Sequence, residues 1–132
     1  MPKILIAEDE ADLRDFLRDE LTEAGFTVTA VANGADAIVA AAEGSFDLFL
    51  LDMFMPGLDG VQTTRVLRKI VPDVPILGLT GYLGRGYMAQ VAHFGVICLS
   101  KPISTADLIQ EISETLESRP SDRNKVSNER RR

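Results

Sequence analysis

The chain has 132 residues, of which 45% are hydrophobic and 26% are charged, and its formal net charge is −6. These values are typical of one soluble domain that buries its own core. No apolar run approaches the roughly 20 residues that span a bilayer, and we expect no secretory signal in the first residues. The single Cys98 cannot form an internal disulfide and is compatible with a reducing compartment. We therefore expect a cytoplasmic protein that does not bind a membrane.

The charge is unevenly distributed along the chain. Residues 1–117 carry an excess of ten negative charges, whereas residues 118–132 carry an excess of four positive charges. The acidic part argues against nucleic acid as a direct partner. The basic part has Val126 as its one sizeable apolar residue, so we expect a domain over 1–117 and a disordered polar tail over 118–132. A weaker alternative is that Arg130–Arg132 form an interaction patch.

Apolar residues follow two alternating patterns along the chain. Short continuous or alternating runs are typical of strands, and the stretches between them place apolar residues at helical spacing. Gly25 is expected to end the first helix. The expected strands cover residues 3–7, 26–31, 47–51, 75–79 and 96–99, and the expected helices cover 11–24, 35–43, 60–70, 87–94 and a last segment capped by Ser104 or Thr105.

Three of these helices have a clear apolar stripe that is expected to face the core. The stripes hold Leu13, Phe16, Leu17, Leu21 and Ala24 in the first helix, Val61, Val66, Leu67 and Ile70 in the third, and Leu108, Ile109, Ile112 and Leu116 in the last.

Strands that alternate with single helices predict right-handed crossovers and a parallel sheet covered on both faces. The wholly apolar run Leu48–Leu51 suits a central strand, and the alternating second strand suits an edge. The fold class expected is a doubly wound α/β fold with five strands.

Four of the five strands end in a residue able to bind a cation or a phosphoryl group. The first strand leads into Glu8 and Asp9, the third into Asp52, the fourth into Thr80 and the fifth into Lys101. The carboxyl ends of parallel strands face one crevice, so we expect these residues to meet there.

Carboxylates that meet in one crevice repel each other unless they protonate or a cation joins them. Two of them about 4 Å apart cost roughly 4 kcal/mol at an effective dielectric near 20. Oxygen ligands with few protein contacts suit Mg²⁺. The alternative for Glu8 and Asp9 is that they only cap the following helix. Asp52 could be a metal ligand, a loop residue without chemistry, or a nucleophile that forms an aspartyl-phosphate.

Thr80 and Lys101 have the groups that would bind phosphoryl oxygens, a hydroxyl and an ammonium. The alternatives are that Thr80 begins a turn with Gly81 and that Lys101 is a solvated loop residue. A cis bond from Lys101 to Pro102 would direct the ammonium inward. The alternative is that Pro102 only begins the last helix.

The residues above, taken together, resemble the receiver domain of bacterial two-component response regulators. The resemblance covers about residues 2–117 and is carried by Glu8-Asp9, the segment Asp52–Gly60 with its Met-Pro and Asp-Gly pairs, Thr80-Gly81 and Lys101-Pro102. It implies a flavodoxin-like fold with strand order 2-1-3-4-5 and five helices.

The same resemblance implies a set of roles. A sensor histidine kinase or a histidine phosphotransfer protein would donate a phosphoryl group to Asp52. Glu8, Asp9, Asp52 and the backbone carbonyl of Phe54 would bind Mg²⁺ or Mn²⁺, and Thr80 and Lys101 would hold phosphoryl oxygens. The chain would then signal to a downstream protein that the sequence does not name, or pass the phosphoryl group on.

One position departs from the family pattern. Receivers usually carry Tyr or Phe three residues before the lysine, where this chain has Cys98. Cys98 is expected to be a small core residue rather than a redox sensor. Tyr82 is a candidate substitute switch residue, with Gly81–Gly86 rearranging on phosphorylation, and its alternative is a surface loop residue that only packs.

Two other classes of function remain open. A Mg²⁺-dependent phosphohydrolase using Asp52 is disfavoured, because haloacid dehalogenase-like enzymes have a second aspartate where this chain has Phe54. A docking module that works without phosphorylation is favoured by Cys98 and opposed by Asp9, Asp52, Thr80 and Lys101. The expected function is a receiver rather than an enzyme.

Overall fold

The computed structural model of the chain describes residues 1–55, 57–81 and 85–118, and for residues 85–88 it describes the backbone alone. Tyr82 and the predicted tail beyond Ser118 lie outside the described residues.

Strands and helices alternate through the described part of the chain, as the sequence predicts. The elements are β1 (Lys3–Ala7), α1 (Ala11–Glu23), β2 (Thr27–Val31), α2 (Gly34–Glu43), β3 (Leu48–Asp52), α3 (Gly60–Ile70), β4 (Ile76–Thr80), α4 (Arg85–His93), β5 (Val96–Ser100) and α5 (Thr105–Glu117). Gly25 has a φ of 106° and follows Ala24, the C-cap of α1. Ser104 caps α5 by accepting a hydrogen bond from the Asp107 backbone N–H.

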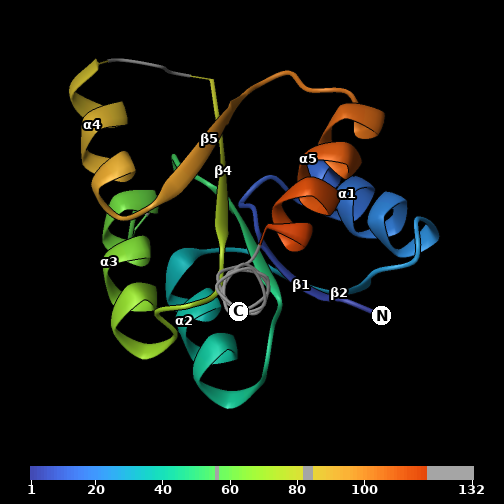
Figure 1. Cartoon of the computed structure of the whole chain (residues 1–132), viewed down its shortest axis with the longest axis horizontal. Coiled ribbons are helices and arrows are strands. Elements are labelled where there is room, and N and C mark those ends of the chain that lie inside the picture. The colour runs from blue at the N-terminus through green and yellow to red at the C-terminus, as the bar shows by residue number, and fades with distance from the viewer. Residues whose placement is uncertain (56, 82–84, 119–132) are drawn as a thin grey trace, which may run out of the picture.

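The five strands form one parallel sheet in the order β2-β1-β3-β4-β5. This is the flavodoxin-like order that the resemblance implies. The central strand β3 is buried along its whole length, whereas the edge strand β2 is exposed or half-buried at every residue. Figure 1 shows α1 and α5 on one face of the sheet and α2, α3 and α4 on the other.

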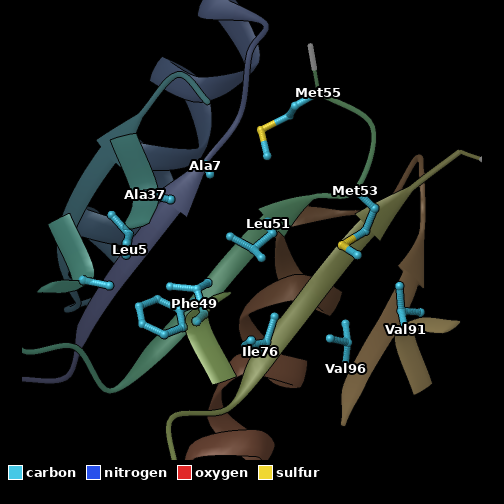
Figure 2. Packing of buried hydrophobic residues seen from close by; sticks show 12 residues of the cluster. Leu5, Ala7, Ala37, Phe49, Leu51, Met53, Met55, Ile76, Val91 and Val96 are labelled. Atoms are coloured by element: carbon cyan, nitrogen blue, oxygen red, sulfur yellow. The ribbon is translucent and has the colours of Figure 1, made fainter. Parts of the chain in front are cut away.

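Successive residues of the central strand serve two separate cores. Phe49 and Leu51 face the core under α2, α3 and α4, together with Met53 (Figure 2). Leu48 and Leu50 face the core under α1 and α5. This alternation follows from the period of two in a strand, so one short segment holds both layers of helices on the sheet.

Two of the predicted apolar stripes are partly wrong. Phe16 in α1 is 51% exposed, and Val66 and Ile70 in α3 are exposed as well. The buried face of α3 instead includes Thr63 and Thr64, which are fully buried.

The close approach of two helices explains the face that α3 buries. A Cβ atom on Gly34 in α2 would collide with the Thr63 hydroxyl. Small side chains on both helices are therefore needed where α2 meets α3, and they displace the larger Val66 and Ile70 to the surface. In α1, only Leu17 and Leu21 are buried. The face of α1 that packs on the sheet therefore includes fewer residues than the apolar stripe predicted from the sequence.

Met53, the residue after β3, fixes the chain immediately beyond Asp52. Its side chain is fully buried, and its backbone O accepts a hydrogen bond from the Gly60 N–H at 3.1 Å. A Cβ atom on Gly60 would lie 2.7 Å from the Met53 Cα. The first residue of α3 therefore has to be glycine for the helix to begin this close to the strand end.

We expect Gly60→Ala to destabilise the fold by about 1–3 kcal/mol, because the added methyl group collides with backbone that cannot rotate away. The measurement is the free energy of unfolding in urea. Gly81→Ala is the control, because a Cβ at Gly81 meets nothing within 4 Å, and its effect should stay within about 0.5 kcal/mol. Equal stability of the two variants would contradict the packing at Met53.

Candidate functional site

The register of the central strands places two acids at one edge of the sheet. Ala7 in β1 pairs with Leu51 in β3, so Glu8 and Asp52 follow at the same level. Both are buried, with 1% and 6% of the residue exposed. Two carboxylates this far from solvent require partners, because an unpaired buried charge costs several kcal/mol.

One ammonium group lies between the two buried carboxylates. Lys101 Nζ is 3.4 Å from Glu8 Oε1 and 3.4 Å from Asp52 Oδ2. The backbone N–H of Lys101 donates to the Thr80 carbonyl at 2.8 Å, which extends the pairing of β4 and β5 by one residue. The bond from Lys101 to Pro102 is cis, which is the alternative in which the ammonium is directed inward.

The second oxygen of each buried carboxylate accepts a backbone N–H. Glu8 Oε2 accepts from Glu10 at 3.1 Å, and Asp52 Oδ1 accepts from Phe54 at 3.1 Å. Each carboxylate is thus held in one orientation, with one oxygen on the chain that follows it and the other on the lysine side. Such preorganisation removes the need to order the groups when a ligand arrives.

A third acid completes the cluster at the surface. Carboxylate oxygens of Glu8, Asp9 and Asp52 lie within 4.8 Å of one another, and Asp9 is exposed. Three hard oxygen donors with one side open to solvent fit a small divalent cation that keeps part of its water. The donor set therefore matches the metal site that the sequence predicts.

Two groups of the cluster, Glu8 and Lys101, have pKa values that differ from their ordinary values. Burial raises the pKa of the Glu8 carboxyl to about 7, and the charge of Asp52 adds to the rise against the Glu10 hydrogen bond and Lys101. Burial lowers the pKa of Lys101, but Asp52 and Glu8 together outweigh it, so that pKa is raised and the ammonium stays charged. One positive charge thus faces up to three negative ones.

The other described residues that the sequence predicts for the site are Thr80, Phe54 and Cys98. Thr80 is fully buried at the end of β4, one residue beyond the Leu79 that pairs with Asp52. Phe54 is exposed, and its backbone N–H donates to Asp52 Oδ1. Cys98 pairs in register with Gly78 further down β5 and packs, half-buried, against the core.

Sequence reasoning missed one residue that supports the site. Arg14 Nη1 donates to the Glu8 backbone carbonyl at 2.9 Å, which ties the first helix to the strand end. The available signal was one basic residue in the acidic first half of that helix, from Ala11 to Phe16.

The fold and this edge of the sheet together define a doubly wound α/β protein with an acidic cluster at the carboxyl ends of its strands. The model of the response regulator receiver domain matches the chain over residues 4–113. The chain belongs to the response regulator receiver domain family, and receiver domains are signalling domains that interact with histidine kinases or phosphotransfer proteins and with downstream targets.

Individual relatives agree with this assignment. The response regulator receiver protein CpdR of Brucella abortus (strain 2308) is 38% identical over 117 residues, which cover 88% of this chain and 98% of CpdR. Several transcriptional regulatory proteins also match, and the chain spans 26–56% of their lengths.

Solved structures show the same fold. The response regulator receiver protein from Sinorhizobium medicae WSM419 is 36% identical with a TM-score of 0.79, and the match covers 88% of this chain and 94% of that one. TrrA from Thermotoga maritima, solved in complex with Mg²⁺ and BeF, is 29% identical with a TM-score of 0.77, over 86% of this chain and 98% of TrrA. Within the described residues, no helix has the length and apolar character needed to cross a membrane.

We expect Asp52→Asn to stabilise the metal-free protein by about 1 kcal/mol at pH 8, because Asp52 has two repulsive neighbours and one attractive one. The measurement is urea unfolding in a chelator and again in Mg²⁺, which should stabilise the wild type more than the variant. Asp19→Asn, which removes an exposed charge on α1, is the control and should change stability by less than about 0.5 kcal/mol. A destabilised Asp52→Asn in chelator would contradict the repulsion.

We expect Cys98 to react slowly with iodoacetamide at neutral pH in the folded protein. Burial raises the pKa of its thiol, so the reactive thiolate is scarce. The measurement is the alkylation rate by intact mass, with the urea-unfolded chain as the reference. A folded protein that reacts as fast as the unfolded chain would favour the redox-sensor alternative.

Proposed function

We propose that the chain accepts a phosphoryl group on Asp52 from a phosphohistidine of a sensor histidine kinase or a histidine phosphotransfer protein. The observation that carries this proposal is the pair of buried carboxylates, Glu8 and Asp52, that share Lys101 beside the exposed Asp9. The phosphorylated domain then binds a downstream protein or passes the group on.

The transfer needs positioning more than a strong base. A carboxylate oxygen of Asp52 attacks phosphorus as the bond from phosphorus to the histidine nitrogen breaks, and the imidazole retains the electron pair and takes a proton from solvent. The hydrogen bond from the Phe54 N–H to Asp52 Oδ1 supports this role, because it holds the carboxylate in one orientation for in-line attack.

Glu8, Asp9, Asp52 and the Phe54 carbonyl are the proposed ligands of Mg²⁺ or Mn²⁺. When bound, the ion supplies positive charge against the crowded carboxylates and the phosphoryl oxygens. The complex of TrrA with Mg²⁺ and BeF supports this assignment by family relationship. Glu8 and Asp52 keep their orientations through the backbone hydrogen bonds from Glu10 and Phe54.

Lys101 and Thr80 are the proposed contacts for the phosphoryl oxygens. The ammonium already lies 3.4 Å from Asp52 Oδ2 and acts as a point charge toward an oxygen attached there. The buried hydroxyl of Thr80 stands at the same edge of the sheet, and the Lys101 N–H binds its carbonyl. A shift of Thr80 toward a phosphoryl group would therefore act on the strand that carries Cys98.

The absence of a second acid after the nucleophile supports signalling rather than turnover. Phe54 stands two residues after Asp52 with its ring exposed, and a hydrocarbon ring cannot act as a general acid or base. We therefore assign the chain a slow, stoichiometric reaction with its own Asp52. The docking alternative, with no phosphorylation at all, predicts the opposite result in the experiment below.

We expect incubation with Mg²⁺ and acetyl phosphate to add the mass of one phosphoryl group to the wild type and nothing to Asp52→Asn. The measurement is intact mass spectrometry of the full chain. Asp59→Asn is a matched control in the same loop, because Asp59 caps α3 and asparagine is an equally good cap, and it should be modified like the wild type. No adduct on the wild type, or an adduct that survives Asp52→Asn, would refute the proposal.

A further inference from the structure

The helix α3 is a basic element in an acidic domain. It carries Arg65, Arg68 and Lys69 without any carboxylate. Residues 1–117 contain eight lysines and arginines and eighteen acids, so three of the eight basic residues lie within five consecutive positions. Figure 1 shows α3 beside α4 on one side of the molecule, with the C-terminal half of α3 turned away from the carboxyl ends of the strands.

A groove of about 680 Å³ lies between these two helices. Val61 and Phe94 give it an apolar part, and both are half-buried. Arg65, Lys69 and His93 give it a polar edge. Among the residues whose side chains the structure describes, no carboxylate lines this groove.

A second, smaller hollow lies on the other side of the same basic residues. It measures about 220 Å³, and Leu58, Gln62 and Val66 line it together with Arg65 and Lys69. Arg65 and Lys69 are four positions apart, so they form one ridge along the helix. A positive ridge thus runs between two partly apolar hollows.

The third basic residue of the helix has a structural task. Arg68 Nε donates to the Phe94 carbonyl at 2.7 Å, and its Nη1 donates to the Val74 carbonyl. These bonds tie α3 to the end of α4 and to the loop before β4. In the described part of the chain, no ion pair joins Arg65 or Lys69 to an acid, so their charges face outward.

We propose that the α3–α4 groove binds an acidic segment of a partner protein. Carboxylates of that segment pair with Arg65 and Lys69, and an apolar side chain between them packs on Val61 and Phe94. A mixture of charged and apolar contacts is what a short peptide offers, since charge sets the encounter and one buried anchor supplies much of the affinity.

The charge balance selects a protein segment over nucleic acid. Tight binding to a duplex draws on roughly 6–10 phosphate contacts, whereas this groove offers two free cations and one histidine. The excess of ten negative charges over residues 1–117 would also repel an extended polyanion at long range. A short acidic peptide needs fewer cations and, with fewer negative charges, meets a weaker repulsion.

The inference does not depend on phosphorylation, since Arg65 and Lys69 lie outside the cluster at Asp52. The probe is a short fluorescein-labelled synthetic peptide with glutamates four positions apart and one leucine between them. Its affinity is measured by anisotropy, and its site is mapped by amide shifts of the ¹⁵N-labelled full chain. Asp52→Asn should bind this peptide as the wild type does.

We expect shift changes confined to α3 and residues 89–95, with an affinity that falls at least about tenfold in Arg65→Glu/Lys69→Glu. Lys3→Glu/Arg18→Glu is the matched control, because it makes the same change in net charge at two exposed sites elsewhere, and it should keep the affinity within about twofold. Each single substitution on α3 should have an intermediate effect.

Several results would overturn the proposal. These are an equal loss of affinity in the control, shift changes outside the groove, equal binding of a peptide with lysine in place of glutamate, and tighter binding of a single-stranded DNA oligonucleotide at this groove. Both double variants change exposed side chains, and thermal unfolding verifies that they remain folded. Weak peptide binding that Arg65→Glu/Lys69→Glu leaves unchanged would also contradict the assignment.

Discussion

Two buried carboxylates, on Glu8 and Asp52, share a single ammonium group at the carboxyl edge of a parallel sheet. Burial of a carboxylate is costly unless it is paired and hydrogen-bonded, and Lys101 supplies one positive charge for two such groups, with Asp9 close by. The cluster is therefore left with an excess of negative charge. Burial raises the pKa of Glu8 and the charge of Asp52 adds to the rise. The excess negative charge also makes the site receptive to a cation. The excess negative charge thus destabilises the metal-free fold, and the proposed chemistry requires it.

The rest of the fold holds this unfavourable cluster in place. Leu51 pairs with Ala7, and Asp52 pairs with Leu79, so the backbone on either side of the acid belongs to the most buried part of the sheet. Met53 then locks the chain against the first turn of α3. Charges that repel would separate on flexible loops, but here they stand at the ends of strands whose register is fixed by both cores. Rigidity beneath the site is what allows repulsion within it.

The sequence predicted which strand-end residues lie together better than it predicted the helix faces. Polar residues at strand ends are informative, because parallel strands bring their carboxyl ends together whatever the details of packing. Helix faces depend on what each helix meets. The expected burial of Val66 failed because the approach of α2 to α3 requires small residues such as Thr63 at the contact. The contact of Arg14 with the Glu8 carbonyl was likewise invisible, since it depends on the angle at which α1 leaves the sheet.

The misjudged face of α3 explains why that helix presents an unusual surface. Burying threonines leaves Val66 and Ile70 outside, next to Arg65 and Lys69, so apolar and basic groups share the exposed side of one element. The N-terminus of that same helix is capped by Asp59 seven residues after Asp52, and its first N–H binds the Met53 carbonyl. One rigid helix therefore extends from the acidic site to the basic groove. Because the two regions carry opposite charge, an anionic partner is kept away from the carboxylates and directed to the far end of α3.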